Sequence, residues 1–140
     1  MHEYTRSVYY YETDKMGVVH HSNYIRWLEE ARNAYFENAD LGYFETEEYG
    51  VMCPVTEMTV KFKHFAGFGD SFTVSTKLIK YTGVRFRLAY TIVNQDGIKL
   101  LEAESGHAFV GPDLKPVSFL RTVPHRHEMM KKLLILEELT

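Results

Sequence analysis

One long helix, predicted between Asn23 and Ala39, constrains the fold of this chain more than any other feature of its sequence. Its bulky apolar residues recur at the spacing that places them on one helical face. These residues are Tyr24, Trp27, Leu28, Ala31 and Tyr35. A helix of roughly 25 Å with so much aromatic surface needs another element to cover that face. Ser22 and Asn23, at its start, are good N-cap residues.

The covering element is predicted to be a sheet, because apolar and polar residues alternate along the chain after the helix. The turn sequence Asn94-Gln95-Asp96-Gly97 separates two predicted strands at hairpin spacing, and connections this short join antiparallel strands. The predicted elements are a first strand at Thr5–Tyr11, a helical turn at Glu45–Gly50, strands at Val51–Lys63, Phe72–Leu78, Val84–Ile92, Lys99–Val110 and Val117–Leu120, and a final helix at His125–Glu138. Pro54 indicates an edge strand or a bulge. One helix against one curved, mainly antiparallel sheet of five or six strands is an α+β architecture.

Length and composition limit the chain to one globular domain spanning residues 1–140. A hydrophobic share of 45% with 25% charged residues excludes a disordered or fibrous chain. The net charge of −3 argues against a nucleic-acid-binding function. Cys53 is the only cysteine, so no internal disulfide is expected. Since the chain has neither an apolar signal core nor a stretch of about 18 apolar residues, we expect no membrane insertion and a cytoplasmic location.

The segment between Tyr11 and Tyr24 carries the residues best suited to chemistry. Asp14 lies in a loop, Gly17 follows three residues later, and His21 stands just ahead of the predicted helix. The free N–H groups and partial positive charge of a helix N-terminus suit an oxyanion formed by addition to an acyl carbonyl. A neighbouring carboxylate can act as general base on water or attack as a nucleophile. The same pattern also occurs in loops that only turn the chain, so these residues by themselves leave both interpretations open.

The same segment contains the pattern Asp14-x-x-Gly17-Val18-Val19-x-His21-x-Asn23-Tyr24, followed by Trp27-Leu28-Glu29-x-Ala31-Arg32. This pattern resembles the signature of the 4-hydroxybenzoyl-CoA thioesterase family. The branch that it resembles most is that of the bacterial acyl-CoA thioesterases, including those associated with the Tol-Pal envelope system. The resemblance is dense over residues 5–40 and looser afterwards, where the Phe68-Gly69-Asp70 turn and the strand pattern still agree.

The resemblance implies a hotdog fold, in which a curved sheet wraps a long central helix, and an enzyme that hydrolyses acyl-CoA thioesters. Asp14 corresponds to the family's catalytic carboxylate, acting as general base or nucleophile. His21 corresponds to the residue at the helix start whose backbone N–H polarises the thioester carbonyl. The substrate-binding positions implied beside them are Gly17, Val19, Ser22 and Asn23. No cofactor is implied, because coenzyme A is part of the substrate, and a homodimer or homotetramer is implied because the family builds its site between two subunits.

The phosphates of coenzyme A need local basic residues in a chain that is acidic overall. The candidates are Lys61, Lys63, Lys80, Arg85 and Arg87, which lie in the strand and turn region after the helix. A solvated strand face is the other interpretation of these five residues.

Two other functions remain open from the sequence. A hotdog dehydratase or hydratase acting on 3-hydroxyacyl-CoA pairs a catalytic histidine with a carboxylate on the opposing helix, for which Glu29 or Glu30 is available. A dimer that binds acyl-CoA without consuming it is the second alternative. The adjacent His20 and His21 lack a carboxylate at ligand spacing, so no metal site is predicted.

Overall fold

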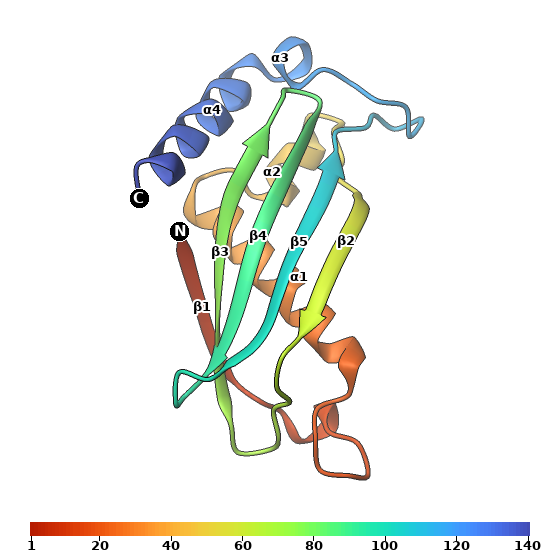
Figure 1. Ribbon diagram of the computed structural model, residues 1–140. Coiled ribbons are helices and arrows are strands. Elements are labelled where there is room, and N and C mark those ends of the chain that lie inside the picture. The colour runs from red at the N-terminus through yellow and green to blue at the C-terminus, as the bar shows by residue number, and fades with distance from the viewer.

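A five-stranded antiparallel sheet curves around helix α1 in the computed structural model, which describes residues 1–140 (Figure 1). The strand order across the sheet is β1-β3-β4-β5-β2, so β1 and β2 are its edges. The strands are β1 (His2–Ser7), β2 (Val55–Phe62), β3 (Ser71–Tyr81), β4 (Arg85–Asn94) and β5 (Lys99–Ala108), and the helices are α1 (His21–Asn38), α2 (Tyr43–Glu48), α3 (Phe119–Thr122) and α4 (Pro124–Glu138), with a 3₁₀ turn, η1, at Tyr10–Glu12. Helix α4 packs along β3, away from β2. The α+β architecture with an antiparallel sheet is confirmed.

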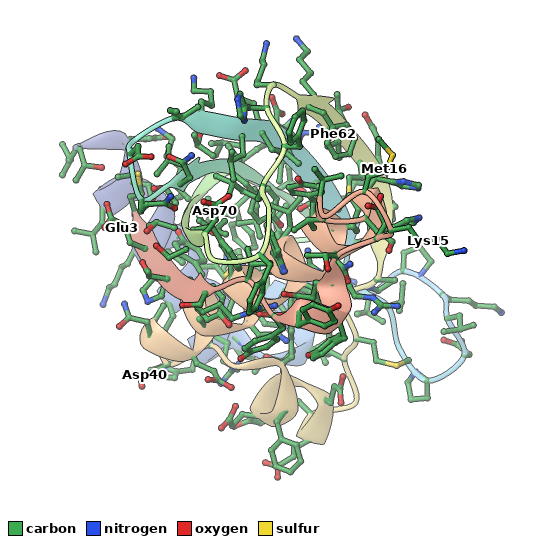
Figure 2. The ribbon with its side chains drawn as sticks, turned by 90° about the horizontal axis from the view of Figure 1, so that it is seen from below. Glu3, Lys15, Met16, Asp40, Phe62 and Asp70 are labelled. Carbon is green, nitrogen blue, oxygen red and sulfur yellow. The ribbon has the colours of Figure 1, made fainter.

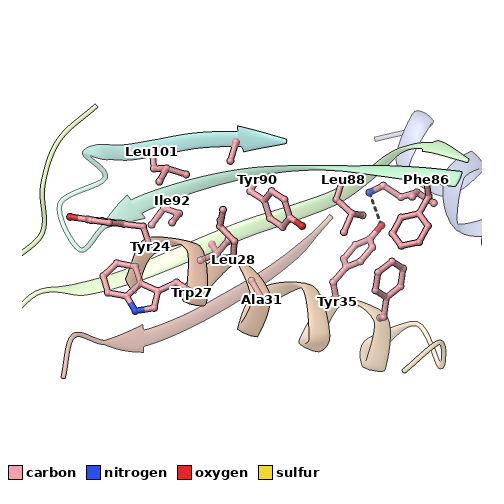
Figure 3. Close-up of a cluster of buried hydrophobic side chains, with 14 of the residues drawn as sticks. Tyr24, Trp27, Leu28, Ala31, Tyr35, Phe86, Leu88, Tyr90, Ile92 and Leu101 are labelled. Atoms are coloured by element: carbon pink, nitrogen blue, oxygen red, sulfur yellow. Dashed lines mark hydrogen bonds between the residues drawn. The ribbon is translucent and has the colours of Figure 1, made fainter. Parts of the chain in front are cut away.

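The core lies between α1 and the inner face of the sheet, and Figure 3 shows the two rows of side chains facing each other. All five apolar residues predicted for the buried face of the helix are at most 3% exposed. On the sheet, the alternation predicted for β4 is confirmed, since Phe86, Leu88, Tyr90 and Ile92 are all buried. Trp27 stacks on Phe72 with ring centroids 3.8 Å apart, which fixes α1 against β3.

The beginning of the chain differs from the sequence prediction. The first strand is His2–Ser7 rather than Thr5–Tyr11, because the chain turns at Tyr10–Glu12 into η1. That turn forms because the Glu12 side chain accepts a hydrogen bond from the Tyr9 N–H (2.8 Å). Helix α1 begins at His21, two residues earlier than predicted, and its N-cap is His20, whose Nδ1 accepts from the Ser22 N–H.

Two further strand predictions are wrong for identifiable reasons. The strand predicted at Val51–Lys63 begins only at Val55, after Pro54, which has no N–H to donate to a ladder. The segment predicted as a strand at Val117–Leu120 forms only a short antiparallel pairing with the residues that follow β5. Val110 bridges to Pro116, and the Val117 N–H donates to the Phe109 carbonyl at 3.0 Å. Phe119 instead stacks on Phe109, at 4.2 Å between centroids, and opens the short helix α3.

Strand β2 is left as an open edge of the sheet. It pairs only with β5, and all eight of its residues are exposed or half-buried, including Val60 and Phe62 on the side of α1. None of the helices combines the length and the apolar character that a membrane span requires.

Candidate active site

The loop that carries Asp14 is a tight hairpin between η1 and α1. Thr13 and Val19 form an antiparallel bridge, and the Asp14 N–H donates to the carbonyl of Val18 at 2.8 Å. Gly17 makes the reversal with φ of +79°, a conformation that side-chain-bearing residues avoid. One oxygen of the Asp14 carboxylate, Oδ1, accepts the Met16 N–H at 2.8 Å. The other oxygen has no partner in the chain, and the residue is exposed, so this carboxylate is oriented and accessible.

The start of α1 lies at the end of the same hairpin. The Ser22 and Asn23 N–H groups donate to the Nδ1 and carbonyl of His20, at 3.2 and 3.0 Å. The N–H of His21 has no acceptor within the chain. It is therefore a free donor at the positive end of an 18-residue helix, as stabilisation of an oxyanion requires.

A surface hollow of about 330 Å³ opens beside the helix start and the end of β2. Its walls include three of the residues predicted from the sequence, namely Val19, His21 and Lys63. Its remaining walls are Tyr24, Phe62, His64 and Phe65. In the view from below, Lys15 and Met16 of the hairpin project on the same side of the molecule as Phe62 (Figure 2). The Asp14 loop, the free helix N–H and the hollow thus share one end of the molecule.

Comparison with known proteins identifies the family of this chain. Residues 8–133 match the model of the thioesterase-like superfamily. The chain belongs to this superfamily. The resemblance seen in the sequence is thereby confirmed, and so is the hotdog fold that it implied.

Several named thioesterases are similar to this superfamily member over most of their length. DHNA-CoA thioesterase from Staphylococcus aureus superimposes with a TM-score of 0.91, at 31% identity, over 97% of this chain and 92% of that one. YneP of Bacillus subtilis (strain 168) is 32% identical over 126 residues, which are 89% of this chain and 91% of that protein. Acyl-CoA thioester hydrolase YbgC of Escherichia coli O157:H7 is 28% identical over 117 residues, covering 83% and 87% of the two chains.

The other polar residues predicted at the helix start of this thioesterase-like chain are engaged inside the chain. The Ser22 hydroxyl lies 2.8 Å from His20 Nδ1. Asn23 is buried, and its amide Nδ2 donates to the Glu12 carbonyl at 2.9 Å. Gly17 stays exposed in the hairpin beside Gly67, where an added Cβ on Gly67 would approach the Gly17 carbonyl to 3.1 Å.

The five predicted basic residues do not all come together. Lys63 lies at the hollow beside His21, whereas Lys61 lies on the outer face of the sheet, with Glu102 and Glu104 around it. Arg85 and Arg87 border a separate hollow of about 160 Å³. That hollow also contains Lys80, Thr56 and Thr82. Arg87 is partly neutralised there, since its guanidinium lies 3.3 Å from Glu104 and 3.6 Å from Glu57.

The largest hollow, of about 360 Å³, lies at the opposite end of β2 and was not anticipated from the sequence. It lies between α1, α2 and the start of β2, and its walls include Arg32, Tyr43, Cys53 and Val55. Burial raises the pKa of the Cys53 thiol to about 12, so this thiol is a poor nucleophile. No sequence signal marks the hollow, because its walls come from segments far apart in the chain.

The structural role of Glu12 was also not anticipated from the sequence. It is 3% exposed and lies two residues before Asp14. Burial acts to raise the pKa of its carboxyl, but hydrogen bonds from Arg6, Trp27 and Tyr9 outweigh it and hold the pKa below its usual range. The carboxylate is therefore charged at neutral pH and structurally bound.

Proposed function

We propose that this superfamily member hydrolyses acyl-CoA thioesters, with Asp14 as its catalytic carboxylate and the His21 N–H as the donor to the carbonyl oxygen. The observation that carries the proposal is a short hairpin with an accessible carboxylate that leads directly into a long helix whose first N–H is free. The names of the relatives, a DHNA-CoA thioesterase and an acyl-CoA thioester hydrolase, support the substrate class.

In the proposed reaction, the thioester carbonyl lies against the His21 N–H and water attacks its carbon. The free oxygen of Asp14 takes one proton from that water as the new C–O bond forms. The tetrahedral oxyanion is stabilised by the N–H and the helix dipole until the C–S bond breaks. The thiolate of coenzyme A leaves and is protonated. Direct attack by Asp14 instead expels the thiolate and gives an acyl anhydride, which water then hydrolyses. If water attacks Cγ of Asp14 in that anhydride, a single turnover in H₂¹⁸O labels Asp14, whereas the general-base route labels only the released acid.

We propose that the working unit contains at least two copies of the chain, joined across the open edge of β2. An unpaired edge with half-buried apolar side chains is suited to pairing with a second strand. In an antiparallel pair, the start of one β2 adjoins the end of the other. The hollow of about 360 Å³ beside Val55 then adjoins the partner's catalytic hairpin, where it can receive the acyl group. Light scattering distinguishes a monomer, a dimer and a tetramer.

The proposal assigns the coenzyme A phosphates to basic residues and requires no cofactor. Lys63 borders the hollow at His21, and Lys80 and Arg85 border the smaller one on the outer face. Replacing each by Ala is expected to raise KM with little change in kcat. Because no metal cofactor is required, activity is expected to survive treatment with a chelator. We also propose a cytoplasmic location, which fractionation of cells tests.

Thiol release from short, long and aromatic acyl-CoAs tests the proposal, with wild type and Asp14→Asn measured together. Loss of the catalytic carboxylate is expected to lower kcat/KM by about 10²–10⁴-fold, or about 3–5 kcal/mol. The matched control is Asp96→Asn, because Asp96 is an exposed aspartate in the turn between β4 and β5 and borders none of the hollows described above. An Asp14→Asn enzyme that hydrolyses as fast as wild type contradicts the proposal.

The alternative functions give different results in the same panel. A dehydratase or hydratase changes the ultraviolet absorbance of a 3-hydroxyacyl-CoA without releasing thiol. The structure disfavours Glu30 for that role, because its carboxylate is bound by Arg6 and by the Tyr4 hydroxyl, at 2.8 and 2.7 Å. A binding protein is stabilised thermally by acyl-CoA and releases no thiol.

A further inference from the structure

Both ends of the catalytic hairpin are tied to a single residue, Glu12. Its backbone carbonyl accepts the N–H of His20, at the far end of the hairpin, at 3.0 Å. The same carbonyl accepts the Asn23 amide in the first turn of α1, at 2.9 Å. Two residues after Glu12 comes Asp14, and one residue after His20 comes the His21 N–H. The separation between the carboxylate and the oxyanion donor therefore depends on where Glu12 is held.

Glu12 is held by its side chain, which is surrounded only by donors. Oε1 accepts from Arg6 Nη1 (3.0 Å) and from the Tyr9 N–H (2.8 Å). Oε2 accepts from Arg6 Nη2 (2.8 Å) and from Trp27 Nε1 (2.8 Å). Four N–H groups from β1, the preceding turn and α1 thus converge on one carboxylate. Such a site requires a group that accepts at both oxygens, because an amide would direct its own N–H against one of these donors.

Arg6 connects this arrangement to the rest of the fold. All five of its N–H groups are used, on Glu12, on Glu30 and on the Ser7 carbonyl. Its guanidinium lies 4.2 Å from the centroid of the Tyr9 ring. Glu30 shares this arginine but makes no bond to the hairpin, and its side chain is 37% exposed. The two carboxylates therefore share one cation, and only Glu12 reaches the catalytic loop.

We propose that Glu12 is the positioning residue of the active site: bound by Arg6 and Trp27, it sets the geometry between Asp14 and the His21 N–H. This inference rests on the proposed function. Asn23 acts in the same way through its amide, rather than by binding substrate.

The test compares kcat and KM of Glu12→Gln, Asn23→Ala and Glu30→Gln with those of wild type and Asp14→Asn. Misplacement by about 1 Å can cost about 10²-fold in rate, so Glu12→Gln is expected to lower kcat by about that factor with little change in KM. Glu30→Gln is the matched control, since it disturbs the same arginine but not the hairpin, and its kcat is expected to stay within about twofold of wild type. All assays are run well below each variant's melting temperature, with the folded fraction measured by circular dichroism.

Asn23→Ala keeps the inference testable if Glu12→Gln does not fold. A lower kcat at unchanged KM supports positioning, whereas a raised KM at unchanged kcat means that Asn23 binds substrate and contradicts the inference. Combining Glu12→Gln with Asp14→Asn adds a second readout. The loss caused by Glu12→Gln is expected to be much smaller in the Asp14→Asn background, because the group to be positioned is already missing.

Other outcomes overturn the inference in distinguishable ways. If Asp14→Asn abolishes hydrolysis while Glu12→Gln keeps wild-type kcat, the proposed function stands and the positioning role is wrong. If Glu12→Gln and Glu30→Gln lose activity equally, in proportion to the folded fraction, Glu12 serves stability alone. If Asp14→Asn equals wild type, the proposed function fails, and the positioning role fails with it.

Discussion

Replacing Arg6 by Met tests how much the partly buried charge cluster of Arg6, Glu12 and Glu30 contributes to stability. Met retains much of the aliphatic length of Arg6 but none of its five N–H donors. The Glu12 carboxylate, whose side chain is 4% exposed, then loses two of its four donors and its only cation. Glu30 loses the same cation but can be solvated, since its side chain is 37% exposed.

The expected cost is set mainly by Glu12. Removing one partner of a buried ion pair destabilises a protein by about 3–5 kcal/mol, because an uncompensated charge remains buried. Loss of the more exposed ion pair with Glu30 adds about 0–1 kcal/mol to this destabilisation. Because the Arg6 side chain is itself 12% exposed, we expect the lower limit, about 3 kcal/mol. For a chain of this length that lowers the melting temperature by about 10 °C.

The difference in unfolding free energy between wild type and Arg6→Met is also expected to depend on pH. In wild type, Arg6 holds the pKa of Glu12 below its ordinary value of 4.5, so this stabilisation is complete above that pH and is lost as the pH falls through the lower native pKa. In the variant, burial without the cation raises the pKa of the same carboxyl, so protonation relieves the buried charge as the pH falls. The difference in unfolding free energy should therefore shrink between pH 7 and pH 4.

Urea unfolding of both proteins at pH 7, 5.5 and 4 measures this difference. Arg87→Met is the matched control, because Arg87 pairs with Glu104 and Glu57 on the exposed outer face and should cost at most about 1 kcal/mol. A difference for Arg6→Met below about 1 kcal/mol at pH 7, or one that is constant down to pH 4, refutes the reasoning.

Two further predictions concern single groups in the core. Tyr35→Phe removes the hydroxyl that accepts the buried Leu78 N–H at 2.9 Å, the bond drawn in Figure 3, and is expected to cost about 1–3 kcal/mol in thermal or urea unfolding; an unchanged midpoint contradicts it. Cys53, whose pKa burial raises to about 12, is expected to react with a disulfide reagent at pH 8 far more slowly in the native protein than in guanidinium. Equal rates in the two states would show that the thiol is accessible.

Much of the fold was predictable because its signals are local. The buried face of α1 follows from residues three and four apart, and the inward side chains of β4 follow from alternation. The pairing of β4 with β5 also follows from the short turn between them. Each of these features depends on residues within a few positions of one another.

The wrong predictions share the opposite property. The first strand ends early because Glu12, at the end of η1, is held by Trp27, 15 residues further along the chain. The segment Val117–Leu120 has a strand-like composition, but its pairing ends at Val117, and Phe119 stacks on Phe109 as the first residue of α3. In both segments, contacts with residues outside the segment outweighed the local strand propensity.

The sequence by itself determined the chemistry that this chain can carry, because Asp14, Gly17 and His21 lie within eight consecutive residues at the start of one helix. Only the tertiary structure decided how that chemistry is held and what surrounds it. It joined Arg6 and Glu30 to the buried Glu12 in one charge cluster, and it separated Lys63 from Arg85 and Arg87. The physical reason is that hydrogen-bond spacing within a hairpin is set by local backbone geometry, whereas burial and charge pairing depend on which distant segments the folded core brings into contact.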